Sequence, residues 1–258
     1  MRLKLSLACS QGAVFTYNYN HFLVEAVNVA LHKTRPVLNV QSPDANLFTF
    51  SQLYFDRYSA SREGICCHGG AVYWYISSPR IVFLESIIKG FKTMGEVALG
   101  DQKMVVDDLE IIADPEIDSE MEFSCMSPIT VSGFNSRGAP RFGRIGDSDF
   151  PELIRQDLVN KYYQIFSVLP LNDDLEIQFN ETYIEKRKRV SRLIDYYGTK
   201  VLGYMVPFTV RGNPELILLG YQLGFGHRNN CGFGMVRVWH RPDQQGSDQG
   251  DKAISQVG

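Results

Sequence analysis

The sequence predicts an α+β protein built from two successive βαββαβ units. Three observations lead to this prediction. The chain of 258 residues is long enough for two domains of roughly 100–120 residues each. Apolar residues make up 44% and charged residues 21%, so both halves can bury a core. Strand and helix periodicities also follow one another in the same order in each half, although the residues themselves show no repeat.

The first half has six predicted elements. Leu3, Leu5 and Leu7 share one face of an initial strand. Apolar residues at helical spacing predict two helices, and Gly90 and Gly95 mark the end of the second. The stretch AVYWYIS is aromatic and β-branched, as is typical of a strand. The predicted order is strand 2–8, helix 21–33, strand 46–54, strand 71–78, helix 80–92 and strand 103–113.

The second half repeats this order more loosely, and Pro214 is a favourable start for its last helix. The predicted elements are strand 121–131, a connection rich in Gly, Ser and Pro, helix 150–166, strand 174–182, strand 200–210, helix 214–223 and strand 233–239. Two such units correspond to two ferredoxin-like domains, residues 1–117 and 118–240. The polar tail, 241–258, is predicted to be disordered.

Before the last strand, the stretch LGFGHRNNCGFGMV holds four glycines, which define the glycine loop (residues 224–234). A P-loop needs four residues between its glycines and a Lys after the second, but five residues separate Gly226 from Gly232, and Phe233 follows. A dinucleotide fingerprint needs glycine where Asn229 stands. Both nucleotide-binding motifs therefore fail on spacing.

Two interpretations of the glycine loop remain. Glycines can supply positive φ in a tight connection and let two backbones approach. They can also expose amide N–H groups to phosphates, with neighbouring polar side chains adding reach. On the second interpretation, the residues expected to contact RNA are Gly224, Gly226, His227, Arg228, Gly232 and Gly234.

The chain has a formal net charge of −3, yet basic side chains outnumber acidic ones in residues 180–240. The excess centres on EKRKRVSR (185–192), here called the basic stretch. A local basic stripe on an acidic protein favours a polyanion partner, whereas a solvated charge run is the commoner meaning of such a stretch alone. The residues predicted to carry salt-dependent RNA affinity are Lys186, Arg187, Lys188, Arg189 and Arg192.

Other features narrow the class of protein. The five cysteines are odd in number and scattered, which favours a reducing cytoplasm over a disulfide framework. Cys66-Cys67-His68 lacks a second ligand pair at zinc-like spacing, so we expect a turn there and no metal site. No segment reaches the ~20 continuous apolar residues of a membrane helix, so no membrane partner is expected.

The stretch GYQLGFGHRNNCGFGMVRV resembles the C-terminal glycine-rich signature of the RAMP superfamily. Within that group, the chain resembles the CRISPR-associated endoribonucleases that cut precursor CRISPR RNA at its repeats. YNYNHFLVEAV (17–27), LFTFSQL (47–53) and SPITV (127–131) are similar to further family segments in the expected order. The resemblance implies that the glycine loop packs between two domains and helps to form the RNA face. It also implies CRISPR repeat RNA as the partner and a metal-independent cut, so no cofactor is expected.

The resemblance implies a catalytic Tyr late on the first helix, a His after it and a Lys beyond, and this sequence departs from that pattern. Asn28 stands where the Tyr would fall, and VLNVQSPDAN, before LFTFSQL, contains no His. Related nucleases place a histidine at the end of the first helix, facing the glycine loop, which points to His32 as general acid/base. The phosphate would be held by Lys33 or Arg35, and the ribose oriented by Tyr17 or Tyr19. Alternatively, His32 is only a cation that favours the helix dipole.

Three functions remain open. The first, which we favour, is a repeat-specific RNA endonuclease whose 2′-OH attack leaves a 2′,3′-cyclic phosphate and a 5′-OH. The second is a non-catalytic paralogue that holds repeat RNA. The third is a structural subunit of a CRISPR effector complex. The sequence leaves open whether the chain forms a homodimer.

Overall fold

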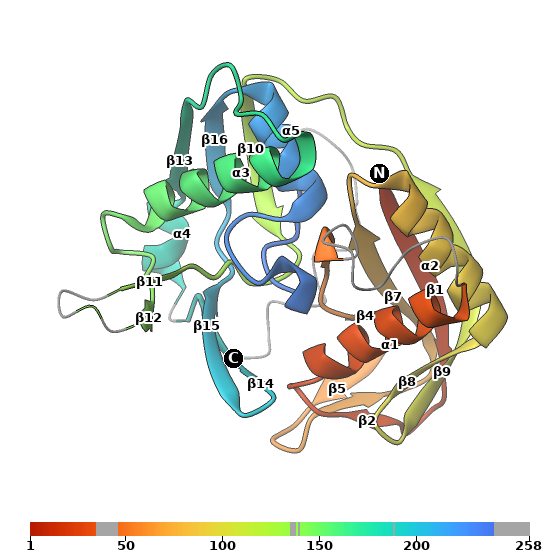
Figure 1. The fold of residues 1–258 in the computed structure, drawn as a ribbon. Helices are drawn as coiled ribbons and strands as arrows, with labels where there is room; N and C mark the ends of the chain where they lie inside the picture. The colour runs from red at the N-terminus through yellow and green to blue at the C-terminus, as the bar shows by residue number, and fades with distance from the viewer. Residues whose placement is uncertain (35–45, 135–137, 139, 188, 240–258) are drawn as a thin grey trace.

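The computed structural model describes residues 1–34, 46–134, 138, 140–187 and 189–239. Two mixed α/β halves lie side by side, each with one main sheet, and the glycine loop lies between them (Figure 1). The predicted α+β class is confirmed. Residues 241–258, which were predicted to be disordered, lie outside the described residues. Arg35 and Lys188, which were predicted to contact the RNA, also lie outside them.

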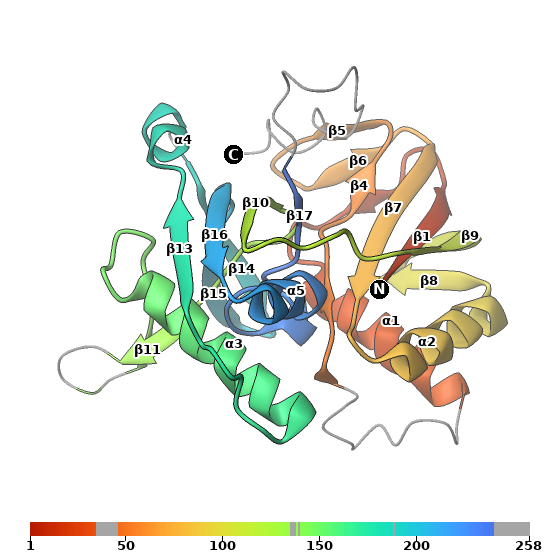
Figure 2. The same ribbon diagram turned by 90° about the horizontal axis from the view of Figure 1, so that it is seen from above.

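The sheet of the first half is antiparallel. Leu3, Leu5 and Leu7 share its inner face, as predicted, and all three are fully buried. The strand order is β3 (Thr49–Phe50), β7 (Gly70–Ser77), β1 (Arg2–Cys9), β9 (Gln102–Ile112) and β8 (Glu96–Leu99), with β4 (Tyr54–Phe55) also paired to β7. Helices α1 (Asn20–Lys33) and α2 (Ile81–Met94) cover one face of this sheet (Figure 2). A separate small sheet has the order β2 (Val14–Phe15), β6 (Ile65–Cys67) and β5 (Tyr58–Ala60).

The main sheet of the second half is also antiparallel. Its strand order is β13 (Leu175–Phe179), β16 (Phe208–Gly212), β10 (Glu120–Cys125) and β17 (Val236–Val238). Helices α3 (Phe150–Phe166) and α5 (Pro214–Leu223) pack on it, and α4 (Glu181–Lys186) follows β13. Two hairpins complete this half: β11 (Ser132–Phe134) with β12 (Pro140–Phe142), and β14 (Ser191–Tyr196) with β15 (Thr199–Tyr204).

The predicted helices are observed with bounds that differ by two residues at most, but several strands differ. The predicted strand 46–54 contains only the short β3 and the start of β4, and the predicted strand 200–210 is divided between β15 and β16. Gly90 does not end α2 but lies inside it, where a Cβ would approach the Ala30 backbone closer than 3.0 Å, so it permits α1 and α2 to pack closely. Gly95 ends the helix with φ +69, as predicted.

The two halves are joined by buried polar contacts. Arg2 is only 3% exposed, and its guanidinium donates to the carbonyl oxygen of Val236 at 2.8 Å. It also lies 4.3 Å from the centre of the Tyr221 ring. All five cysteines are free. No helix among the described residues is both long enough and apolar enough to cross a membrane.

Candidate nucleic-acid interface

The glycine loop is an internal connector between the two halves. Asn20, the first residue of α1, donates from Nδ2 to the carbonyl oxygen of Cys231 at 2.9 Å. Thr49 Oγ1 donates to the carbonyl oxygen of Phe233 at 3.0 Å. Phe225 and Phe233 are fully buried. The loop thus contacts the first half through α1 and β3, and both phenyl rings pack in the interior.

The four glycines are buried, with φ between +77 and +88. The amides of Gly224, Gly232 and Gly234 donate to the carbonyl oxygens of Gly220, Asn229 and Pro128, at 2.8, 2.9 and 2.9 Å respectively. These three amides therefore face protein acceptors, and they do not form the predicted phosphate-binding surface. The physical reason is close packing: a Cβ on Gly226 would lie 2.5 Å from the Thr130 carbonyl oxygen.

Beneath the glycine loop, Lys161 of α3 donates from Nζ to the carbonyl oxygens of Gly224 and Gly226, at 3.0 and 2.8 Å. It also pairs with Asp157, one helical turn earlier, and burial lowers the pKa of its ammonium group. The sequence interpretation missed this pair. The Asp-x-x-x-Lys spacing within the predicted helix 150–166 was the available signal.

His227 lies at the edge of the same cluster, half-buried. Its Nδ1 accepts the backbone N–H of Ser132 at 2.8 Å, and its Nε2 lies 3.8 Å from Asp157 Oδ1. Burial is the largest influence on its pKa, which is lowered although Asp157 acts in the opposite direction. The neutral imidazole is therefore favoured, with its proton on Nε2. The next residue, Arg228, is exposed, at φ +60.

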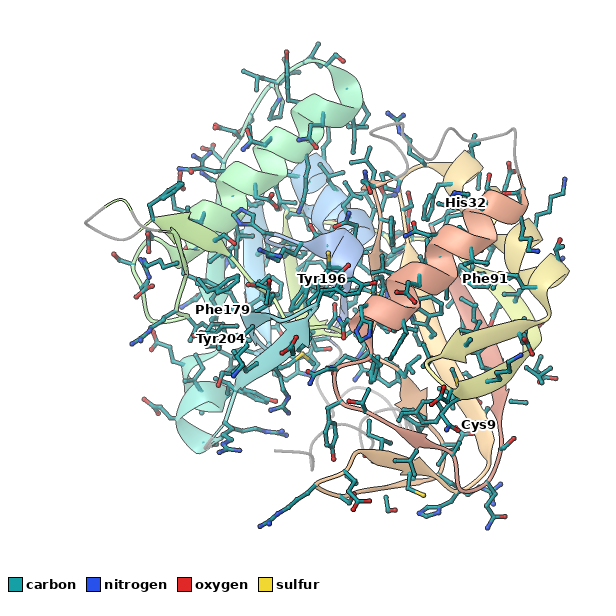
Figure 3. The ribbon with its side chains drawn as sticks, turned by 60° about the horizontal axis from the view of Figure 1, so that its bottom comes forward. Cys9, His32, Phe91, Phe179, Tyr196 and Tyr204 are labelled. Carbon is teal, nitrogen blue, oxygen red and sulfur yellow. The ribbon has the colours of Figure 1, made fainter. Side chains whose placement is uncertain are left out.

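The predicted catalytic residues lie at opposite ends of α1. His32 is exposed at the C-terminal end, and its Nδ1 lies 2.7 Å from the Asn28 carbonyl oxygen (Figure 3). Lys33 beside it is also exposed. Tyr19 precedes the helix, is 5% exposed, and accepts the N–H of Leu53 at 3.0 Å. At 1.5 Å per residue, the described helix separates His32 from Asn20 by about 18 Å.

Two expectations are therefore corrected. Asn20, at the start of α1, contacts the glycine loop, so the predicted orientation of the His32 end toward that loop is wrong. Tyr19 does not join His32 in one site, and its phenol has a structural hydrogen bond. Burial raises the pKa of Tyr19 to about 12. The prediction failed because it combined residues from the two ends of the predicted helix 21–33, and a helix of this length holds its ends apart.

The basic stretch continues from α4 into β14. Lys186, Arg187 and Arg189 are exposed, and the Arg187 guanidinium lies 4.9 Å from the centre of the Tyr183 ring. Arg192 is half-buried, and burial is the main reason why its pKa is lowered. The neighbouring arginines lower this pKa further, whereas Tyr183 raises it. The structure thus brings several cations together at one end of the second half, separate from the buried glycines.

A cavity of about 660 Å³ adjoins the basic stretch at the boundary between the halves. Tyr17, Phe55 and Tyr58 line it from the first half, and Arg189 and Arg192 line it from the second. Segments that are far apart in the sequence thus meet at this cavity. Among the described residues, no group of three or more His, Cys, Asp or Glu side chains is arranged to hold a metal ion.

Comparisons with known proteins agree with this two-part architecture. Residues 14–110 match the family described as CRISPR-associated protein Cas6, N-terminal, and residues 112–238 match CRISPR-associated protein Cas6, C-terminal. The chain belongs to the Cas6 family. It is 29% identical to a CRISPR-associated endoribonuclease Cas6 of Methanocaldococcus jannaschii, over 92% of each chain. It is also 27% identical to a putative CRISPR-associated endoribonuclease-like Cas6 of Pyrococcus furiosus, over 92% of this chain and 98% of the relative.

Solved structures of Cas6 proteins share the fold. A structure from a Cas6-related gene of Pyrococcus furiosus superposes with a TM-score of 0.84 at 25% identity, over 95% of this chain and 99% of the other. A structure described as CRISPR-associated protein Cas6 superposes with a TM-score of 0.80 at 26% identity, over 93% and 99% of the two chains. The similarity to Cas6 proteins thus extends over both halves.

Proposed function

We propose that this Cas6-family protein is an endoribonuclease that cuts precursor CRISPR RNA at its repeats without a metal ion. The observation that carries this proposal is the match of both halves to Cas6 families, together with a relative named as a CRISPR-associated endoribonuclease over 92% of the chain. The 2′-OH upstream of the scissile bond attacks the phosphate, which leaves a 2′,3′-cyclic phosphate and a 5′-OH. This reaction needs a base, an acid and a cation beside the phosphorane.

His32 is the proposed general acid/base. Its Nδ1 is positioned to donate to the Asn28 carbonyl oxygen, which fixes the ring and leaves Nε2 of an exposed imidazole for substrate. Neutral Nε2 takes the proton of the 2′-OH, and the resulting imidazolium returns a proton to the leaving 5′-oxygen. Lys33, the next residue, supplies the proposed positive charge beside the phosphate.

One observation favours a second candidate, a non-catalytic RNA-binding protein. The phenol of Tyr19 is buried and accepts the N–H of Leu53. Tyr19 lies about 20 Å along α1 from His32, so it cannot orient a ribose beside His32 in this arrangement. Without Tyr19, the proposed site contains only the imidazole of His32 and the ammonium group of Lys33. On this alternative, repeat RNA binds along the basic stretch and is released without being cut.

The test uses the full-length protein, 5′-labelled repeat RNA of its host and excess EDTA, with products resolved on a denaturing gel. We expect one cut that ends in a cyclic phosphate. His32→Ala should slow cutting about 10²- to 10⁴-fold and leave RNA affinity unchanged, because only proton transfer is lost. The matched control is His68→Ala, since His68 is also exposed but lies beyond β6 in the small sheet.

If His32→Ala cut the RNA as fast as the wild-type protein, His32 would be excluded as the general acid/base. Wild-type protein that shifts the RNA on a native gel but never cuts it would establish the non-catalytic alternative.

We also propose that the two halves are ferredoxin-like domains divided near residues 117/118. The support is the strand order: each main sheet contains a second–third–first–fourth arrangement of the βαββαβ unit, β3-β7-β1-β9 and β13-β16-β10-β17. In each unit one helix follows the first strand and another follows the third. On this proposal, the glycine loop with His227 and Arg228 stabilises the junction between domains, and the basic stretch contacts RNA phosphates.

A further inference from the structure

The cavity beside the basic stretch has walls of different chemistry. Tyr17, Phe55 and Tyr58 supply aromatic surface, whereas Arg189 and Arg192 supply positive charge. Its volume of about 660 Å³ lies within the roughly 300–1,000 Å³ of typical small-ligand sites. Among the described residues, no Asp or Glu lines it. This combination is suited to an aromatic ligand that carries negative charge.

Among the residues that the structure describes, no carboxylate pairs with Arg189 or Arg192. Arg192 is half-buried, and the only hydrogen bond of its guanidinium among the described residues is to the carbonyl oxygen of Ser191, at 3.3 Å. The charged neighbours that influence it include Arg187 and Arg189, both of the same sign, and no carboxylate. A half-buried guanidinium without an anion is costly unless a ligand supplies the anion. A phosphate group meets this need with bidentate hydrogen bonds.

The aromatic wall is held in place before any ligand arrives. The hydroxyl of Tyr17 donates to the carbonyl oxygen of Ser61 at 2.7 Å, so the 36%-exposed ring is fixed at the edge of the cavity. Phe55 is buried against Phe15 and Tyr58, with ring centres 5.3 and 6.2 Å away. Fixed rings reduce the entropy lost when a planar group stacks on them.

The two walls belong to different halves of the protein, and a hydrogen bond joins them at the cavity. Asn18 Oδ1 accepts the backbone N–H of Asp195 at 2.9 Å. Asn18 and Gln52 both line the space and offer carboxamide groups, which can pair with the edge of a nucleobase. The site therefore depends on the packing of β14 against the segment that precedes α1.

We propose that this cavity binds one unpaired nucleobase of the RNA, stacked on the aromatic wall at Tyr17, with the adjacent phosphate held by Arg192. This inference rests on the proposed function, because it takes the ligand to be the RNA that the protein processes. A concave site accepts a base only when that base is outside a duplex, and stacking on aromatic side chains is the usual way that proteins hold such bases. The site would thus position unpaired RNA.

The test uses full-length protein and host repeat RNA whose cut is blocked by a 2′-deoxy sugar. Each unpaired position carries 2-aminopurine in turn. We expect a large fluorescence change at one position. The Tyr17→Leu variant should lose this change and bind the RNA about tenfold more weakly. Tyr17→Phe, which keeps the ring, should retain the signal. Arg192→Gln should weaken binding and lower the salt slope by about 1. The matched control is Tyr163→Leu, since Tyr163 is 55% exposed on α3 and outside the cavity.

Each outcome separates this inference from the proposed function. If the blocked RNA binds without a signal at any position, while unmodified repeat RNA is cut at one site, the base site is overturned and the nuclease proposal stands. A signal that persists in Tyr17→Leu would place the base elsewhere and would also overturn it. Wild-type protein that neither binds nor cuts the repeat would overturn both proposals together.

Discussion

The glycine loop and the basic stretch are both expected from the sequence to contact RNA, yet the structure places them in opposite environments. All four glycines of the loop are buried, and three of their amides donate to protein carbonyl oxygens. Along the basic stretch, Arg187 and Arg189 are exposed, and no carboxylate pairs with either among the described residues. A dense glycine motif therefore indicates close backbone packing at least as strongly as it indicates a ligand. Unpaired charge is the better indicator of a ligand.

This difference has a thermodynamic consequence. Substitutions in the glycine loop should act mainly on the free energy of unfolding, because its groups are already bonded within the protein. Substitutions in the basic stretch should act mainly on RNA affinity, because its groups have few partners in the free protein. Variants at Lys161, at Gly234 and in the basic stretch test this separation.

The largest effect is expected at Lys161. Lys161→Met would remove the ammonium group that donates to Gly224 and Gly226, and it would leave the Asp157 carboxylate unpaired with its side chain only 16% exposed. Loss of one partner of a buried ion pair costs about 3–5 kcal/mol of unfolding free energy. Urea denaturation followed by circular dichroism measures this change.

The control for Lys161 is an exposed pair of the same type. Lys103 lies 2.6 Å from Glu96, with side-chain exposures of 65% and 47%. Lys103→Met should cost less than about 1 kcal/mol, because water screens exposed pairs. Equal losses in the two variants would show that the ammonium group beneath the glycine loop has no special structural role.

The next effect is expected at Gly234, and it separates strain from crowding. Gly234 has φ +79, and a Cβ there would approach the Phe225 carbonyl oxygen closer than 3.0 Å. Gly198, in the β14–β15 turn, has φ +80 and no atom within 4 Å of the same position. Gly198→Ala should cost about 1–2 kcal/mol from the left-handed conformation alone. Gly234→Ala should cost a further ~1–3 kcal/mol from overpacking, measured in the same denaturation experiment.

If Gly234→Ala were no worse than Gly198→Ala, close packing would not explain the glycines. The interpretation of the loop as an exposed surface would then regain support.

The sequence predicted those elements whose evidence is local. Apolar spacing within α1 and α2, and Pro214 at the start of α5, marked these helices without knowledge of their partners. The β14–β15 hairpin was missed because Tyr197, at φ +51, occupies a turn position that usually selects Asn or Gly. Only Gly198 signalled the turn.

The candidate site was less predictable because it depends on distant partners. Burial of Gly232 is imposed by Phe50, and the cavity combines Tyr17 with Arg192 across the boundary between the halves. The cationic part was visible because five basic residues are close in sequence. The internal role of the glycines was not visible, since the same pattern fits a ligand or a neighbouring chain segment.

The smallest effect on stability, and the most specific effect on RNA, is expected in the basic stretch. We predict that Arg187→Gln with Arg189→Gln lowers the slope of log affinity against log salt by about 1–2, because each phosphate contact contributes about 0.7–0.9. The free energy of unfolding should change by less than about 1 kcal/mol, since both side chains are exposed and the main interaction removed is the stacking of Arg187 on the Tyr183 ring.

The matched control is Lys89→Gln with Lys92→Gln, a second exposed pair on α2. Equilibrium binding of repeat RNA at several salt concentrations measures both slopes. If the two double variants lower the slope equally, RNA attraction is a property of total charge, and the basic stretch has no privileged position. If only the arginine pair lowers it, the RNA path runs along α4 and β14, beside the cavity and away from the buried glycines.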